Sequence, residues 1–313
     1  MKIIFMGTPD FAVGTLRSLA EAGHEITLVV SQPDKPKGRG HAMVPTPVKA
    51  VAEELGIPVF QPVKIREAKD VLEKTEADVC VVAAFGQIIP KTILDMPKYG
   101  CLNIHASLLP KYRGAAPIQQ AVIDGEKESG VTITQMGVGL DTGDMISQAV
   151  VPLAEDETGG SLFDKLAEEG AALLIRTLPS IADGTAVYTK QPEESPTPYA
   201  AMISKKMGLM DFSKSAVELE RLVRGLNPWP SAYTFLNGKT LKVWKCAVER
   251  AECGKEAPGT IIGVDKSGIH VACGSDTLIL KEVQLEGKKR METDAFLRGY
   301  QVTAGTMLKD HKE

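Results

Sequence analysis

Long apolar runs are missing from this chain. None approaches the roughly 18 residues that a membrane-spanning helix needs. Residues 1–7 have the composition of a strand and lack the charged leader and small-residue cleavage site of a signal peptide. These absences argue against a membrane protein and a secreted protein, so we expect a cytoplasmic protein that makes no membrane contact.

Cysteine and histidine are scarce and show none of the spacings of a metal site. The five cysteines are odd in number and form no C-x-x-C pair, and the five histidines form neither H-x-H nor H-E-x-x-H. Reduced thiols with a structural role are therefore the expected state of the cysteines. The sequence supports no metal site, and we expect an activity that needs no metal.

A basic excess is also missing, since the net charge is −4. This balance argues against a general nucleic-acid-binding protein. The charge is uneven, however. Residues 1–204 carry 18 basic and 26 acidic residues, a net charge of −8, whereas residues 205–313 carry 18 and 14, a net charge of +4. A basic C-terminal part is compatible with a polyanionic partner that docks on one side of the protein.

The first half of the chain does contain short apolar runs that alternate with helical segments. The runs are rich in Val, Ile and Cys and lie at residues 3–7, 26–31, 79–85 and 100–104. They lack polar alternation, which indicates strands that are buried on both faces. The pattern predicts an α/β fold with a doubly wound, mostly parallel, Rossmann-like sheet, in which ligands bind beyond the carboxyl ends of the strands. We also expect a helix at residues 113–123 and a long helix at residues 158–182, with a break near Pro179.

The second half changes in composition. Residues 187–206 are rich in proline, which predicts an extended and exposed linker. Glycines then separate several short apolar runs between residues 238 and 274, a pattern that favours a small, OB-like β-barrel. We therefore predict an α/β domain at residues 1–186, a linker at 187–206 and a β domain at 207–313.

Three polar residues follow apolar runs of the predicted sheet. Asn103 and His105 are two positions apart at a strand end, so strand alternation points both side chains to one face. Asp141 begins a glycine turn after the apolar run 131–136 and can reach the same edge. An amide, a base and a carboxylate can carry an amine through attack on an acyl carbon. Taken singly, each also fits an Asx turn that satisfies backbone groups.

The surrounding motifs resemble a known family. Residues 103–119, NIHASLLPKYRGAAPIQ, and residues 140–144, LDTGD, are similar to folate-dependent formyltransferases. The resemblance implies a formyltransferase-type sheet, 10-formyltetrahydrofolate as formyl donor and co-substrate, and a catalytic trio of Asn103, His105 and Asp141. It also implies a folate site formed by Ser107, Leu108, Leu109, Pro110, Phe85 and Gly86.

The trio has distinct expected roles. His105 can accept a proton near neutral pH. Asp141, if it forms a hydrogen bond with the imidazole, fixes the tautomer of the ring and stabilises its charged form. Asn103 is then the donor to the oxygen of the tetrahedral intermediate.

A basic loop indicates the acceptor. Residues 35–49 contain four basic residues and no acidic residue, a composition that is also typical of an ordinary solvated loop. PKGRG and PTPVK within it resemble the insertion with which the methionyl-tRNA branch of the family enters the acceptor arm. This resemblance implies formylation of the α-amine of methionyl initiator tRNA, giving N-formylmethionyl-tRNA for translation initiation, by an expected monomer. The implied tRNA contacts are Arg39, Lys37, Lys35, Lys205 and Lys206.

Two alternatives remain open. A formyltransferase or formyl-hydrolase of the same architecture would act on a sugar-nucleotide amine or on the folate itself, without tRNA. A folate-binding or RNA-binding protein without turnover belongs to another class, and the intact trio argues against it. Residues 207–210 depart from the family pattern, because Met-Gly-Leu-Met replaces a stretch that usually carries several charges. We expect this departure to weaken linker contacts to tRNA.

Overall fold

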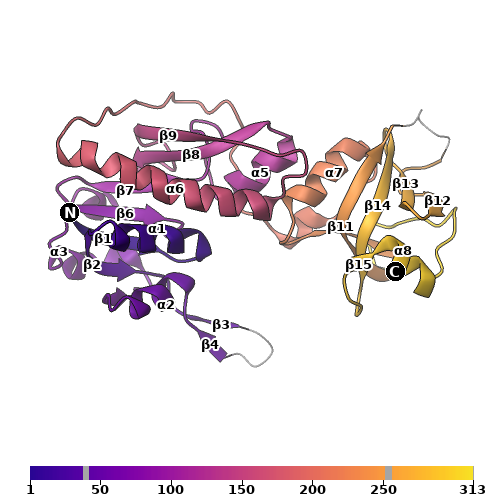
Figure 1. Cartoon of the computed structure of the whole chain (residues 1–313), viewed down its shortest axis with the longest axis horizontal. Coiled ribbons are helices and arrows are strands. Elements are labelled where there is room, and N and C mark those ends of the chain that lie inside the picture. The colour runs from indigo at the N-terminus through magenta and orange to yellow at the C-terminus, as the bar shows by residue number, and fades with distance from the viewer. Residues whose placement is uncertain (38–41, 251–255, 313) are drawn as a thin grey trace. The chain divides into compact units, whose positions relative to one another are not determined.

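The computed structural model describes residues 1–37, 42–250 and 256–312 (Figure 1). The chain forms two compact units. Unit 1 comprises Met1–Pro117, Glu128–Pro152 and Phe163–Ala200, and unit 2 comprises Ile118–Lys127, Leu153–Leu162 and Ala201–Glu313. Among the described residues, no helix has the length and apolar composition needed to cross a membrane.

Unit 1 contains a seven-stranded sheet in the order β5-β2-β1-β6-β7-β8-β9. The first five strands pair in parallel, whereas β8 and β9 join antiparallel at one edge. The predicted doubly wound, mostly parallel sheet is therefore confirmed. The strands are β1 (Lys2–Gly7), β2 (Glu25–Val30), β5 (Val59–Phe60), β6 (Val79–Ala83), β7 (Cys101–His105), β8 (Glu128–Gln135) and β9 (Met145–Pro152).

Helices cover this sheet. One buried cluster joins alternate residues of β1, such as Ile4 and Met6, to Leu72 and Ile93 from the helical segments that follow β5 and β6. At the end of β1, a Cβ on Gly7 would lie 2.7 Å from the Cβ of Ala12, so glycine permits the close turn into α1. The helices of unit 1 are α1 (Asp10–Glu21), α2 (Pro47–Glu54), η1 (Ile65–Glu67), α3 (Lys69–Glu73), α4 (Lys91–Leu94) and α6 (Gly159–Ala182), the last from Phe163 on. Helix α5 (Pro117–Asp124) belongs to unit 2 from Ile118 on.

Two helices differ from the sequence-based expectation. A helix was expected to begin at Arg113, but α5 begins at Pro117, because Gly114 forms a β-bridge with Ala200. A break was expected near Pro179, but α6 continues to Ala182, and the carbonyl of Pro179 accepts a hydrogen bond from the backbone N–H of Asp183.

Unit 2 is built on an antiparallel sheet in the order β10-β11-β14-β13-β12, with β15 on β14. Its core includes Leu219 and Val223 from a helix and Val243 and Leu280 from the sheet. The predicted small β domain is therefore confirmed. Its elements are η2 (Lys205–Gly208), α7 (Ala216–Gly225), β10 (Ala232–Leu236), β11 (Lys239–Glu249), β12 (Ile261–Asp265), β13 (Gly268–Ala272), β14 (Thr277–Leu285), β15 (Met291–Glu292) and α8 (Thr293–Gly299).

The apolar segment 207–210 has a structural role in unit 2. Met210 is 1% exposed, belongs to the core of the unit, and donates its backbone N–H to the carbonyl of Tyr233 at 2.9 Å. The methionine therefore stabilises the β domain where the family pattern usually carries charge. The effect of this departure on tRNA contacts stays a prediction.

Candidate active site

The strand β7 presents Asn103 and His105 at its carboxyl end. Asn103 pairs with Thr134 and His105 with Thr132 of β8, so both lie in the middle of the sheet. His105 is buried, whereas Asn103 keeps part of its side chain exposed. Within the described part of the chain, the carboxamide of Asn103 has no protein hydrogen-bond partner. It therefore remains available to a ligand.

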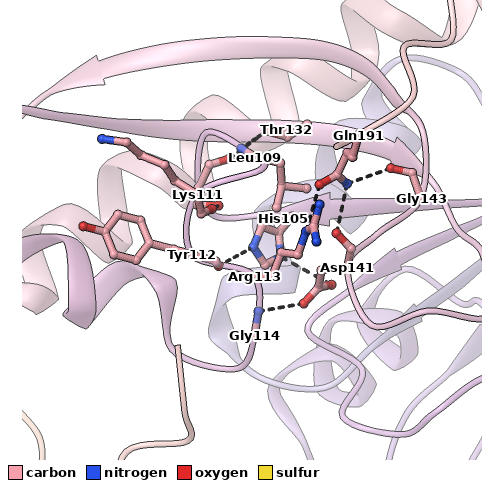
Figure 2. A network of polar contacts seen from close by, with 11 residues as sticks. His105, Leu109, Lys111, Tyr112, Arg113, Gly114, Thr132, Asp141, Gly143 and Gln191 are labelled. Atoms are coloured by element: carbon pink, nitrogen blue, oxygen red, sulfur yellow. Dashed lines mark hydrogen bonds and ion pairs between the residues drawn. The ribbon is translucent and has the colours of Figure 1, made fainter. Parts of the chain in front are cut away.

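His105 is held on both sides of its ring (Figure 2). Its Nε2 lies 3.0 Å from the carbonyl oxygen of Tyr112, which can only accept, so Nε2 carries a proton. Its Nδ1 lies 3.6 Å from Oδ1 of Asp141, an ion-pair distance when the ring is protonated but too long for a hydrogen bond. The hydrogen bond considered from the sequence is thus absent, and Tyr112 fixes the tautomer instead.

Asp141 is held by two other segments, by the backbone of one and by a side chain of the other. Its Oδ2 accepts a hydrogen bond from the N–H of Gly114 at 2.9 Å. Its backbone carbonyl accepts from Nε2 of Gln191 at 2.9 Å. The side chain is only 16% exposed, so its charge lies in a partly desolvated position beside His105. The bond from Gly114 orients the carboxylate, and the bond from Gln191 holds the backbone that carries it.

Left-handed backbone conformations gather around the site. Ala84 follows β6 with a φ of 46°, Tyr112 follows β7 with a φ of 57°, and Asp141 follows β8 with a φ of 52°. Non-glycine residues adopt this region rarely, and a bulky residue such as tyrosine more rarely still. Such conformations persist only where the surrounding contacts enforce them, and they cluster at functional sites.

The loop after β7 holds four of the predicted folate contacts. Thr132 Oγ1 donates to the carbonyl of Ser107 at 2.7 Å and accepts from the N–H of Leu109 at 3.1 Å. The hydroxyl of Ser107 turns to the carbonyl of Lys111 at 2.7 Å. Ser107 and Leu109 are buried and shape the loop, whereas Leu108 and Pro110 retain partly exposed side chains. Contact of these four residues with folate stays a prediction.

The turn after β6 contains the other two predicted folate contacts, Phe85 and Gly86. Val82 pairs with Asn103, which places this turn beside the end of β7. The side chain of Phe85 is 2% exposed and belongs to the core, so a folate contact from Phe85 would come from its backbone. The carbonyls of Phe85 and Gly86 accept from Nε2 of Gln32 at 3.2 and 3.0 Å. Gly86 has a φ of 83°, which glycine adopts without strain.

The predicted tRNA contacts divide between the units. In unit 1, β3 (Lys35–Lys37) and β4 (Ala42–Val44) form an antiparallel pair, in which Lys35 is exposed and only the backbone of Lys37 is described. Arg39 lies outside the described residues. Lys205 and Lys206 are exposed in η2 of unit 2.

The base of the β3–β4 hairpin is anchored by polar contacts. Lys49 Nζ lies 2.6 Å from Oδ2 of Asp34, and this hydrogen bond lowers the pKa of the Asp34 carboxyl below its ordinary value. Ser31 and Thr46 share a hydrogen bond of 2.6 Å, and Thr46 also caps α2. The hairpin therefore emerges from a fixed position on unit 1.

Three residues at the site escaped the sequence-based reasoning. Arg113 and Gln191 are only 8% and 6% exposed, and they contact each other. Tyr199 is half exposed and packs against Gly114; the partial burial of its phenol and the nearby carboxylate of Asp141 raise the pKa of that phenol. Arg113 belonged to the recognised motif without a role, whereas Gln191 and Tyr199 lay in a segment that composition marks as exposed.

Gly143 closes the loop that carries Asp141. A Cβ at this position would lie 1.9 Å from the carbonyl oxygen of Gln135, whose N–H in turn donates to the carbonyl of Asp144 at 2.8 Å. We expect Gly143→Ala to displace Asp141 and to lower kcat by about tenfold or more. The variant Gly137→Ala in the same loop, where a Cβ meets no atom within 4 Å, should keep the wild-type kcat. Equal kcat values for the two variants would refute this role of Gly143.

Models of known families match both parts of the chain. A model described as formyl transferase matches residues 1–178, and one described as formyl transferase, C-terminal domain, matches residues 202–301. Among curated relatives, the methionyl-tRNA formyltransferase of Agathobacter rectalis is 60% identical over 98% of this chain and 99% of its own. The methionyl-tRNA formyltransferase of Lachnospira eligens is 53% identical over 98% of this chain and 99% of its own.

Solved structures share the fold at much lower identity. A sugar 3N-formyl transferase in the presence of dTDP and 5-N-formyl-THF matches with a TM-score of 0.66 and 19% identity, over 92% of this chain and 99% of its own. HypX from Aquifex aeolicus in complex with tetrahydrofolic acid matches with a TM-score of 0.63 and 16% identity, over 95% of this chain and 47% of its own. These two likenesses establish the arrangement of elements.

Proposed function

The chain belongs to the formyl transferase family, and we propose that it uses Asn103, His105 and Asp141 to transfer the formyl group of 10-formyltetrahydrofolate to the α-amine of methionyl initiator tRNA. The product is N-formylmethionyl-tRNA for translation initiation. Full-length relatives that are 50–60% identical to this chain are methionyl-tRNA formyltransferases, and they confirm the predicted family and activity. Two observations support the roles of the trio: Asn103 and His105 lie two residues apart in β7, and Nδ1 of His105 lies 3.6 Å from Oδ1 of Asp141.

We assign stabilisation of the formyl oxygen to Asn103. When the neutral amine attacks the formyl carbon, a C–N bond forms and the carbonyl electron pair moves to oxygen. A carboxamide that is partly exposed and has no hydrogen-bond partner among the residues that the structure describes can donate to this oxygen as its charge develops. Asn103 fits this role because no hydrogen bond to a described residue must be broken first.

We assign proton transfer to the pair formed by His105 and Asp141. After attack, the former amine nitrogen carries one proton too many, and the pair accepts it. As the bond between carbon and N10 breaks, the pair returns a proton to N10 and tetrahydrofolate leaves. The Tyr112 carbonyl occupies Nε2, so exchange takes place on the side of Nδ1 and Asp141.

The donor is a formyl-tetrahydrofolate, as the family implies, and we propose the 10-formyl isomer. Its pocket is assigned to the loop that contains Leu108 and Pro110 and to the backbone of Phe85 and Gly86. The partly exposed side chains of the first two and the glycine turn of the last support this assignment.

We assign tRNA binding to the β3–β4 hairpin of unit 1 and to the basic residues 205–313. We propose that residues 1–186 form the catalytic domain, that residues 187–206 form the linker, and that residues 207–313 bind tRNA. The excess of positive charge in residues 205–313 supports attraction of a polyanion.

Arg39 provides a specific prediction for tRNA. We expect Arg39→Ala to lower kcat/KM for methionyl-tRNA by about tenfold, because a charge-assisted hydrogen bond to the tRNA is lost. Binding of folate, measured by calorimetry, should not change. Arg176→Ala, which removes an exposed arginine of α6, is the control. Loss of folate binding in the Arg39 variant would indicate a folding defect and would overturn the assignment.

The acceptor is tested by formylation with three reaction mixtures. The full chain and 10-formyltetrahydrofolate are mixed with methionyl initiator tRNA, with a sugar-nucleotide amine, or with no acceptor. We expect product on the tRNA alone. Transfer only to the sugar, or release of formate without an acceptor, would contradict the proposed acceptor.

A further inference from the structure

The chain after α6 returns along the candidate active site as a strap, residues 189–200. At its start, Thr189 and Met145 exchange two backbone hydrogen bonds of 2.8 Å. Near its end, Thr197 Oγ1 accepts from the N–H of Tyr112 at 2.7 Å, and the N–H of Ala200 donates to the carbonyl of Arg113 at 2.8 Å. The strap therefore contacts both loops that hold His105 and Asp141, and all of these residues belong to unit 1.

The strap is largely exposed, and its two buried residues are Gln191 and Ala200, of which Gln191 is the polar one (Figure 2). Its Nε2 donates to the carbonyls of Asp141 at 2.9 Å and Gly143 at 2.7 Å. Its Oε1 accepts from Nε of Arg113 at 3.1 Å. The opposite amide orientation would set oxygen against two carbonyl oxygens and N–H against N–H, so the contacts permit one orientation.

Arg113 holds Gln191 in turn. Its guanidinium also donates to the carbonyls of Glu193 at 3.0 Å and Pro192 at 2.7 Å, so three donors bind the strap. The next residue, Gly114, donates its N–H to the carboxylate of Asp141. Asp141 is thus held at its carbonyl by Gln191 and at its carboxylate by the neighbour of Arg113.

We propose that Gln191 is a positioning residue for formyl transfer, which fixes the carboxylate of Asp141 beside His105 and is itself oriented by Arg113. The proposal rests on the proposed function of this site. Asp141 has a left-handed backbone, a conformation that persists only with external support, and the two bonds from Gln191 to this loop supply that support. The role requires the N–H donors of the amide, so a side chain of equal volume without donors cannot replace it.

The variant Gln191→Glu removes those donors with little change in size. It keeps an oxygen for Arg113 but sets a carboxylate oxygen against the carbonyls of Asp141 and Gly143. We expect kcat to fall by about 10- to 100-fold, with little change in KM for 10-formyltetrahydrofolate. If the glutamate variant fails to fold, Gln191→Met takes its place in the test. Methionine fills a similar volume without donors, so this variant should show a similar loss of kcat. Glu194→Gln, the reverse exchange at an exposed strap position, should behave as the wild type.

A double-variant cycle separates positioning from general stability. If Gln191 acts through Asp141, Gln191→Glu should cost less than about twofold in kcat when Asp141→Asn is already present. Losses that multiply, or a Gln191→Glu enzyme with wild-type kcat, would overturn the proposal.

A second readout does not depend on activity. The N–H of Gly114 donates to the Asp141 carboxylate, so positioning predicts that its hydrogen exchange, followed by NMR, becomes faster in Gln191→Glu and stays unchanged in Glu194→Gln. Unchanged exchange of the Gly114 N–H in Gln191→Glu would overturn the proposed positioning role, whatever the activity of the wild type. A wild-type protein that formylated no acceptor would refute only the proposed function.

Discussion

Replacement of Asn103 by alanine is expected to lower kcat for formyl transfer by about 10²- to 10³-fold. The carboxamide donates to an oxygen that carries charge only in the transition state and the tetrahedral intermediate. Its loss should therefore reduce kcat while leaving the KM values of both substrates nearly unchanged. Steady-state kinetics with methionyl-tRNA and 10-formyltetrahydrofolate measure the two effects separately.

The variant Asn103→Asp sharpens this test. Aspartate has the same shape but places a charged acceptor where the amide donates, so its kcat should be at least as low as that of Asn103→Ala. Because Asn103 is partly exposed and has no protein partner among the described residues, neither substitution removes an internal hydrogen bond. Turnover close to that of the wild type in either variant would show that the oxyanion is stabilised elsewhere.

Replacement of His105 by glutamine is expected to lower kcat by about 10²- to 10⁴-fold. Glutamine can still donate an N–H to the carbonyl of Tyr112, so the loop after β7 keeps a partner for that group. It cannot accept and return a proton at neutral pH. The loss should therefore appear in kcat, measured at saturating concentrations of both substrates.

His24 supplies the control for this substitution. It lies between α1 and β2 and contacts the amino group of Met1, away from the catalytic trio. His24→Gln should keep the wild-type kcat. If His105→Gln retained turnover within a few-fold of the wild type while folding normally, proton transfer would have to be assigned to another group.

Much of the fold follows from local patterns. Strands such as β1 and β6 are buried along nearly their whole length, and a continuous apolar run reports this directly. The period of two along β7 places Asn103 and His105 on one face without further information. Asp141 is 36 to 38 positions further along the chain, and its motif and family resemblance assigned it to the site.

The remaining features of the site depend on distant contacts. Gln191 lies 50 positions from Asp141, and a proline-rich composition cannot reveal that one of its polar side chains is buried. The tautomer of His105 depends on the carbonyl of Tyr112, which is turned toward the ring by a backbone conformation that tyrosine seldom adopts. Helix α5 begins late because Ala200 pairs with the residues before it. None of these partners is visible in a local window of sequence.

The most direct test of the account is a single-turnover measurement of formyl transfer. Excess enzyme with bound 10-formyltetrahydrofolate is mixed with methionyl initiator tRNA, and formylmethionyl-tRNA is quantified over time for the wild type and for the double variant Asn103→Ala/His105→Gln. We predict folate-dependent product with the wild type and a rate at least about 10³-fold lower with the double variant, which should still bind tRNA. A double variant that forms product at a rate near that of the wild type would contradict the claim that this strand end performs the transfer.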